Sequence, residues 1–274
     1  MKPVAFDYAR PTSLAHALQM LAATPDAKVL AGGQTLGPML NLRLAQPALL
    51  VDISRIPELA AVSEDRRSVT VGATVTHAAI EDGRAGDPTG GFLRRVAAGI
   101  GYRAVRTRGT VGGSLANADP AADWLACLTG LDAHLTIAAA SGRRRVPLAG
   151  FVVGAMQTAL GEAELIAGIE LRKFPPQARF GFAKICRRSG EFAEAIGVAV
   201  HDPDRETTRL VASTPTGAPV VAEAADLRAD RDHLPGLPEL RQRLLAAGFV
   251  GDDYAVRLSV VALRRALTDM VAHG

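Results

Sequence analysis

Two Gly-Gly segments, at residues 29–36 and 110–120, constrain this chain more than any other feature of its sequence. Each segment contains a glycine pair followed by a hydroxyl side chain, Thr35 in the first and Ser114 in the second. Because glycine has no Cβ and accepts positive φ angles, backbone N–H groups in such turns can approach a phosphate closely. Two segments of this kind predict a ligand with a diphosphate, held from two sides.

The first glycine segment lies within an α/β pattern. Residues 28–31 predict a buried strand that runs into the glycines, residues 36–44 a helix, and residues 48–53 a second strand. An earlier helix over residues 14–21 has Ser13 as its expected N-cap. Since ligands gather at the carboxyl ends of strands in such units, the first segment is expected at a ligand-binding edge.

The rest of the chain predicts a second unit and a separate C-terminal domain. Strands are expected over residues 68–72, 133–139 and 164–171, and helices over residues 76–81, 91–98 and 121–128. Pro175-Pro176 interrupts this pattern and predicts a domain boundary. Beyond it, a three-stranded antiparallel sheet and two amphipathic helices are expected, with strands at residues 182–186, 195–200 and 208–212 and helices at residues 237–247 and 254–271.

Several familiar sites are excluded by the motifs that this sequence lacks. No Gly-Lys-Ser/Thr follows either glycine pair and neither segment reads G-x-G-x-x-G, which excludes a Walker A loop and leaves a nicotinamide site unsupported. Gly113-Ser114 lacks the G-x-S-x-G context and the Ser-His-Asp set of a serine hydrolase. Two cysteines are too few for an iron–sulfur cluster and no histidines have zinc-ligand spacing, so no metal is expected. Cys127 and Cys186 are expected to be buried, reduced thiols.

Charge and hydropathy narrow the classes of partner. A net charge of +3 with 4% aromatic residues does not indicate nucleic-acid binding, and no apolar run is long enough for a membrane span. The first residues lack the pattern of a signal peptide, which predicts a cytoplasmic location. Arg143-Arg144-Arg145 predicts a solvated hairpin turn. Five arginines near the second glycine segment could contact an anionic ligand or an acidic partner, or have only a surface role: Arg94, Arg95, Arg103, Arg106 and Arg108.

Three blocks of sequence resemble the flavoprotein subunit of the molybdenum hydroxylases. They are Ala31-Gly32-Gly33-Gln34-Thr35 with Asn41-Leu42-Arg43-Leu44 after it, residues 106–123, and residues 182–193. In order and spacing they resemble the separate FAD subunit of carbon monoxide dehydrogenase and xanthine dehydrogenase-like enzymes over essentially the whole chain. The resemblance implies an α+β fold with a PCMH-type, vanillyl-alcohol-oxidase-like FAD-binding domain at residues 1–174, in subdomains of about 1–56 and 57–174. A small C-terminal domain with the antiparallel three-stranded sheet and helices would occupy residues 178–274.

The resemblance implies FAD as the cofactor of this chain, with no catalytic residue beyond the flavin. Backbone amides of the first segment would wrap the diphosphate, and the second segment would hold it from the other side. Asp123 would contact a ribose or adenine group, and Phe192 would lie beside the isoalloxazine. Asn117 stands where many relatives have His. The implied cofactor-binding residues are Val29, Leu30, Ala31, Gly32, Gly33, Gln34, Thr35, Leu36, Thr110, Val111, Gly112, Gly113, Ser114, Asn117, Asp119, Asp123, Ile166, Lys184 and Phe192.

The resemblance also implies a role within a larger complex. An iron–sulfur small subunit would pass electrons from its [2Fe–2S] clusters to this FAD and on to an external acceptor, and a large subunit would carry the molybdopterin-bound molybdenum. The assembly would be a dimer of heterotrimers. Two alternatives stay open, a stand-alone flavin-dependent oxidase of the vanillyl-alcohol-oxidase-like fold and a flavin-binding scaffold without electron transfer. The short C-terminal domain shows no acid–base pair for the first alternative, and the intact loops disfavour the second.

Overall fold

The N-terminal lobe is a three-stranded parallel sheet with two helices. The computed structural model describes residues 2–213, 217–225, 227 and 234–273. The strands of the N-terminal lobe run in the order β1-β3-β2. The elements are β1 (Asp7–Ala9), α1 (Leu14–Ala23), β2 (Lys28–Leu30), α2 (Leu36–Asn41) and β3 (Leu49–Asp52). The hydroxyl of Ser13 accepts a hydrogen bond from the His16 amide, so the predicted N-cap of α1 is confirmed.

The middle lobe is a five-stranded antiparallel sheet with helices packed along it. Its strand order is β4-β5-β10-β6-β7. The strands are β4 (Val62–Glu64), β5 (Ser68–Gly72), β6 (His134–Ala139), β7 (Gly142–Pro147) and β10 (Leu165–Arg172), and a small hairpin pairs β8 (Val152–Gly154) with β9 (Gln157–Thr158). The helices are α3 (Pro57–Ala60), α4 (His77–Glu81), α5 (Phe92–Ala98), α6 (Arg103–Arg106), α7 (Val111–Asn117) and α8 (Asp123–Gly130).

The C-terminal part has a four-stranded antiparallel sheet, so the expected three-stranded sheet is corrected by one strand. Its order is β11-β12-β13-β14, with η1 (Pro203–Arg205) between β12 and β13. The elements are β11 (Arg179–Ile185), β12 (Ala195–Asp202), β13 (Thr207–Ser213), β14 (Val220–Glu223), α9 (Leu237–Ala246) and α10 (Asp253–Ala272). The added strand, β14, is four residues long and directly follows Pro219. It is too short for the alternation of apolar and polar residues that predicts a strand.

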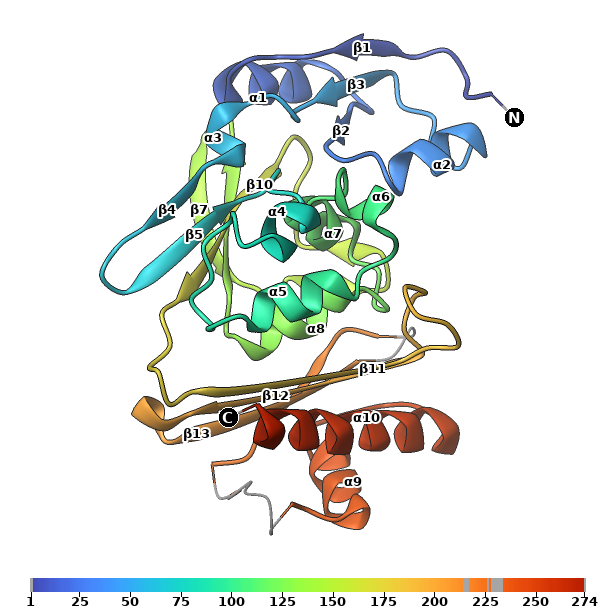
Figure 1. Cartoon of the computed structure of the whole chain (residues 1–274). Helices are drawn as coiled ribbons and strands as arrows, with labels where there is room; N and C mark the ends of the chain where they lie inside the picture. The colour runs from blue at the N-terminus through green and yellow to red at the C-terminus, as the bar shows by residue number, and fades with distance from the viewer. Residues whose placement is uncertain (1, 214–216, 226, 228–233, 274) are drawn as a thin grey trace.

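The C-terminal sheet lies between two layers of helices (Figure 1). One face packs against α10 and the other against α5 and α8 of the middle lobe. A single hydrophobic core therefore contains Leu125 and Leu128 of α8 together with Ile196, Val198 and Val211 of the sheet. A second core fills the space between the sheet, α9 and α10, and a third lies beneath α1. The middle lobe and the C-terminal sheet are thus held by shared apolar packing.

Two further expectations are corrected. Arg143, Arg144 and Arg145 lie in the edge strand β7 and not in a hairpin turn, and they face Glu58, Glu164 and Glu170 respectively. Charged side chains on an edge strand oppose pairing with another chain, which explains why a strand carries them. Cys127 is buried as expected, whereas Cys186 is only half-buried.

Candidate functional site

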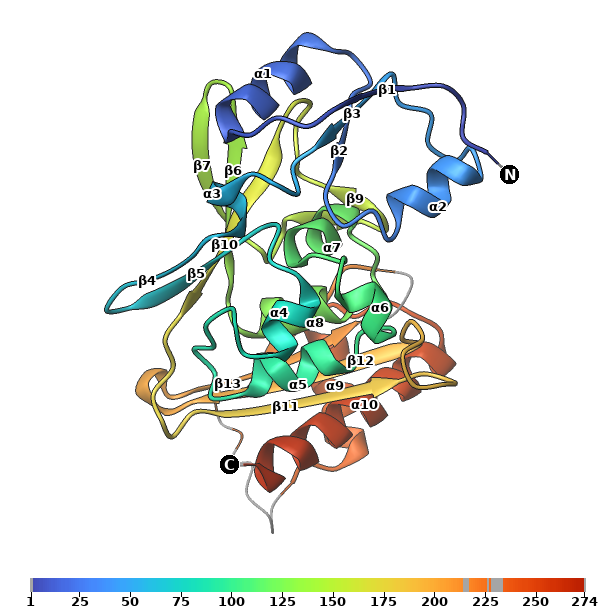
Figure 2. The ribbon, with the colours of Figure 1, turned by 45° about the horizontal axis from the view of Figure 1, so that its top comes forward.

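The two glycine segments lie side by side between the N-terminal and middle lobes (Figure 2). A Cβ built on Gly32 would overlap the carbonyl oxygen of Arg108 and lie 2.9 Å from Gly109 Cα. A Cβ on Gly113 would lie 3.8 Å from the Ala31 Cβ. Only glycine at position 32 allows this approach of the two backbones, so the structure brings together the segments that the sequence separates by about 80 residues.

The first segment carries a row of unused backbone donors. Among the described residues, the amides of Gly32, Gly33, Gln34, Thr35 and Leu36 have no hydrogen-bond acceptor. Gly33 has φ +69°, a left-handed conformation that turns successive amides toward one side. Thr35 precedes α2 without its side chain capping the helix. These donors fit a diphosphate, because successive amides in such a turn form an anion-binding concavity.

The second segment differs, since the amides of residues 111–114 are already bonded within the protein. It forms the short helix α7, and its first amides donate to Val75 O, Ala73 O, Thr110 Oγ1 and Thr110 O, from Val111, Gly112, Gly113 and Ser114 respectively. The hydroxyl of Ser114 has no partner among the described residues. The Ser114 hydroxyl is therefore a free donor of this segment.

The arginines near this segment are mostly engaged in ion pairs. Arg106 binds Glu81 with two nitrogens, at 2.7 and 3.0 Å, and Arg103 pairs with Asp82 at 2.7 Å. Arg95 pairs with Asp269 at 3.1 Å, and Arg94 donates to the Glu81 carbonyl oxygen. Arg108 alone among the five has no side-chain partner in the described part of the chain. The other four therefore already have hydrogen-bond acceptors within the protein.

A buried ion pair joins the middle lobe to the C-terminal sheet. Lys184 Nζ on β11 lies 3.0 Å from Asp123 Oδ2 at the start of α8, with side chains 11% and 5% exposed. The second carboxylate oxygen of Asp123 is buried and has no partner among the described residues. Burial raises the pKa of Asp123, and the Lys184 ammonium opposes that rise. The free oxygen leaves an acceptor for a ligand hydroxyl.

The remaining predicted site residues lie on α7, in the turn before α8, on β10, in the loop after β11 and on β2. Asn117 ends α7, with its amide nitrogen 3.9 Å from the sulfur of Met156, and Asp119 accepts a bond from the Ala121 amide in the turn before α8. Ile166 is buried on β10, which packs against α7. Phe192 is 66% exposed in the loop after β11. Val29 and Leu30, the first two residues of the first segment, end β2.

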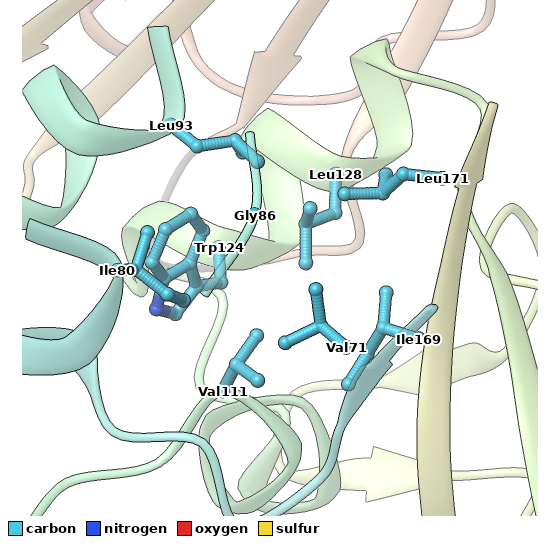
Figure 3. A pocket seen from close by; sticks show the side chains of 9 residues that line it. All are labelled: Val71, Ile80, Gly86, Leu93, Val111, Trp124, Leu128, Ile169 and Leu171. Carbon is cyan, nitrogen blue, oxygen red and sulfur yellow. The ribbon is translucent and has the colours of Figure 1, made fainter. Parts of the chain in front are cut away.

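Some residues that support the site carried no signal in the sequence. His77 accepts a hydrogen bond from the indole of Trp124, 47 residues later, and Glu81 holds Arg106, 25 residues later. Such long-range pairs leave no local pattern. Elsewhere, a small pocket near Trp124 has a wholly apolar lining and no polar group to orient a ligand (Figure 3); its walls are Val71, Ile80, Gly86, Leu93, Val111, Trp124, Leu128, Ile169 and Leu171.

The described residues contain neither a membrane-spanning helix nor a cluster of metal-binding side chains. No helix there is both long and apolar enough to cross a membrane. No group of three or more His, Cys, Asp or Glu side chains is arranged there to hold a metal ion.

Comparison with known proteins places the chain in a family. Residues 4–173 match the family described as the FAD binding domain in molybdopterin dehydrogenase. The chain is 38% identical over 194 residues to the 6-hydroxypseudooxynicotine dehydrogenase complex subunit alpha of Paenarthrobacter nicotinovorans, covering 70% of this chain and 66% of that protein. It is 36% identical over 201 residues to the carbon monoxide dehydrogenase medium chain of Hydrogenophaga pseudoflava, covering 73% and 70%.

A solved structure extends the likeness to the whole chain. Carbon monoxide dehydrogenase from Hydrogenophaga pseudoflava, in the form that lacks the Mo-pyranopterin moiety of its cofactor, superposes with a TM-score of 0.88 at 30% identity, covering 99% of both chains. The α+β fold and the family resemblance are thereby confirmed. The chain belongs to the family of FAD binding domains of molybdopterin dehydrogenases, as the FAD-binding medium subunit of a multi-subunit oxidoreductase.

Proposed function

We propose that this chain holds FAD between its two glycine segments and passes electrons from the [2Fe–2S] clusters of a small subunit to an external acceptor. A large subunit with molybdopterin-bound molybdenum would oxidise the organic substrate, and two such heterotrimers would form the complex. The names of the relatives, a dehydrogenase complex subunit and a dehydrogenase medium chain, support a role within an assembly. The two unpaired cysteines are compatible with work in the cytoplasm.

The observation that carries the proposal is the row of five unused amides at residues 32–36, set against the second segment. The diphosphate of FAD would accept hydrogen bonds from these amides. The hydroxyls of Thr35 and Ser114 would add donors from the two sides, and the remaining backbone of residues 29–31 and 110–113 would shape the concavity. This division gives the first segment the main phosphate contacts.

The other site residues would act on the rest of the cofactor. The free oxygen of Asp123 would accept a hydrogen bond from a sugar hydroxyl, with Lys184 holding the carboxylate in place. Ile166, Asn117 and Asp119 would line the side near α7, and the exposed Phe192 ring would cover one flavin face. When bound, FAD supplies a carrier that accepts and releases electrons, a chemistry that no side chain of the protein provides.

A pair of matched variants tests the placement of the diphosphate. Gly113→Asp and Gly113→Asn add side chains of the same size, so both meet Thr110 Oγ1, which would lie 2.7 Å from a Cβ at this position. Only the Asp carboxylate would repel a phosphate. We expect the purified Gly113→Asp chain to retain far less FAD than the Gly113→Asn chain, measured by flavin absorbance per polypeptide. Equal flavin content in the two variants would contradict this placement.

A second experiment tests the relay. Flavin bound to the chain is mixed without oxygen with the reduced iron–sulfur subunit, and its visible absorbance is followed. Rapid bleaching supports electron transfer between subunits, whereas flavin that stays oxidised indicates the scaffold alternative. Turnover of a small organic substrate by this chain alone would instead indicate a stand-alone oxidase.

A further inference from the structure

His77 is a buried imidazole that contacts two parts of the flavin site. It is 5% exposed at the start of α4. Its Nδ1 accepts a hydrogen bond from Trp124 Nε1 at 3.0 Å, and Trp124 directly follows Asp123 in α8. Its backbone amide donates to the Gly109 carbonyl oxygen at 2.9 Å. One residue thus touches both the helix that carries Asp123 and the turn that precedes the second glycine segment.

The imidazole lies directly against Gly109. A Cβ built on Gly109 would be 2.8 Å from His77 Cδ2 and Nε2, closer than such atoms approach in folded proteins. Gly109 Cα would also be 2.9 Å from a Cβ on Gly32. Gly109 therefore lies close both to the imidazole and to the first glycine segment.

The surroundings keep this ring in one protonation state. Nδ1 accepts the indole N–H, so the proton of the neutral ring resides on Nε2. Burial, with a smaller contribution from the Arg106 guanidinium, lowers the pKa of His77 to about 4. At the other end of α4, Glu81 pairs with Arg106 and Arg103, and Asp82 also pairs with Arg103, so two carboxylates balance the two guanidinium charges. The ring therefore packs as an uncharged, fixed wedge at neutral pH.

We propose that His77 is a positioning residue for FAD: its ring, fixed by Trp124, sets the separation of the two glycine segments and thereby the shape of the phosphate concavity. The inference rests on the proposed function of these segments. It makes His77 matter for cofactor affinity although the side chain itself does not reach the phosphate donors.

Three variants of the full chain test the proposal, with FAD affinity measured by quenching of flavin fluorescence. His77→Asn keeps an acceptor for the Trp124 indole but removes the part of the ring beside Gly109. Gly109→Ala places a methyl group where the ring lies. The double variant puts that methyl group into the space which the shorter side chain leaves. His201→Asn is the control, because the His201 side chain is half-buried on β12 and, among the described residues, its imidazole hydrogen-bonds Thr208.

We expect each single variant to bind FAD about tenfold more weakly, as a shift of roughly 1.4 kcal/mol would produce, and the double variant to regain affinity. The His201→Asn control should match the wild type, and thermal melting reports whether each chain is folded. If His77→Asn does not fold, His77→Gln replaces it. Unchanged affinity in the single variants, or losses that add in the double variant, would overturn the proposal. A wild-type chain that takes up no FAD would overturn the proposed function as well.

Discussion

Lys184 and Asp123 meet at 3.0 Å across the junction between the C-terminal sheet and helix α8, with both side chains almost completely buried. Where the same sheet packs on α5, the Phe92 and Phe180 rings are stacked, with centroids 5.3 Å apart. Because the surroundings of this ion pair are apolar, few polar groups could take the place of Lys184 or Asp123 as a partner. It therefore ties the position of an expected cofactor residue to the docking of the whole sheet.

Removing one member of this pair should destabilise the chain strongly. In Lys184→Met the Asp123 carboxylate stays buried without its partner, and we expect a loss of about 3–5 kcal/mol of unfolding free energy. The double variant Lys184→Met/Asp123→Asn should lose less than the single one, because no charge is left unpaired. Urea unfolding measures both. As a control, Arg187→Met breaks a pair whose Arg187 side chain is 85% exposed, and should change stability little. A loss in Lys184→Met no larger than in this control would contradict the prediction.

The contact of the two glycine segments predicts different outcomes at two nearby glycines. In Gly32→Ala the new methyl group would overlap Arg108 O, so the segments must separate. We expect FAD retention to fall sharply and the melting temperature to drop. In Gly37→Ala the methyl group has no atom within 4 Å, and alanine favours helix α2 by about 1 kcal/mol over glycine. Gly37→Ala should keep its flavin and melt no lower than the wild type. Equal flavin retention in both variants would argue against close packing of the segments.

The pKa of His77 predicts loss of stability in mild acid. The unfolded chain binds a proton on His77 as the pH falls below about 6.5, whereas the folded chain does so only near pH 4. Between these values protonation favours the unfolded state, and the cost to folding reaches about 3 kcal/mol. In His77→Asn this contribution should be absent. The test compares unfolding free energies at about pH 7 and about pH 4.5 in both chains; parallel curves would contradict the assignment.

Shared packing predicts that the FAD-binding region is unstable without the C-terminal sheet. A chain that ends at Phe174 would expose the face of α8 which packs on β12 and β13. Because Leu125 and Leu128 share one core with Val198 and Val211, we expect this fragment to aggregate or to lack cooperative unfolding. Gel filtration and circular dichroism check this. A monomeric fragment that melts cooperatively would show that the lobes fold independently.

Long, periodic elements were predictable from the sequence, whereas several short ones were not. The twenty residues of α10 show a helical period, and β12 begins with a continuous apolar run. Strands β1, β4 and β8 have three residues each, too few for a pattern to emerge from local composition. Arg143, Arg144 and Arg145 suggested a turn because charge alone does not distinguish a solvated loop from the exposed face of an edge strand.

The sequence by itself determined the two glycine segments, the order of most helices and strands, and the protein family. Each of these depends on residue types that lie close together along the chain. Tertiary structure decided how the segments divide their tasks. The amides of residues 111–114 are bonded within the protein, whereas those of residues 32–36 are not. It also brought His77 to Gly109, and Lys184 to Asp123. These pairings depend on how strands and helices pack. Residues that are 30 or more positions apart come into hydrogen-bonding distance only after the chain between them has folded.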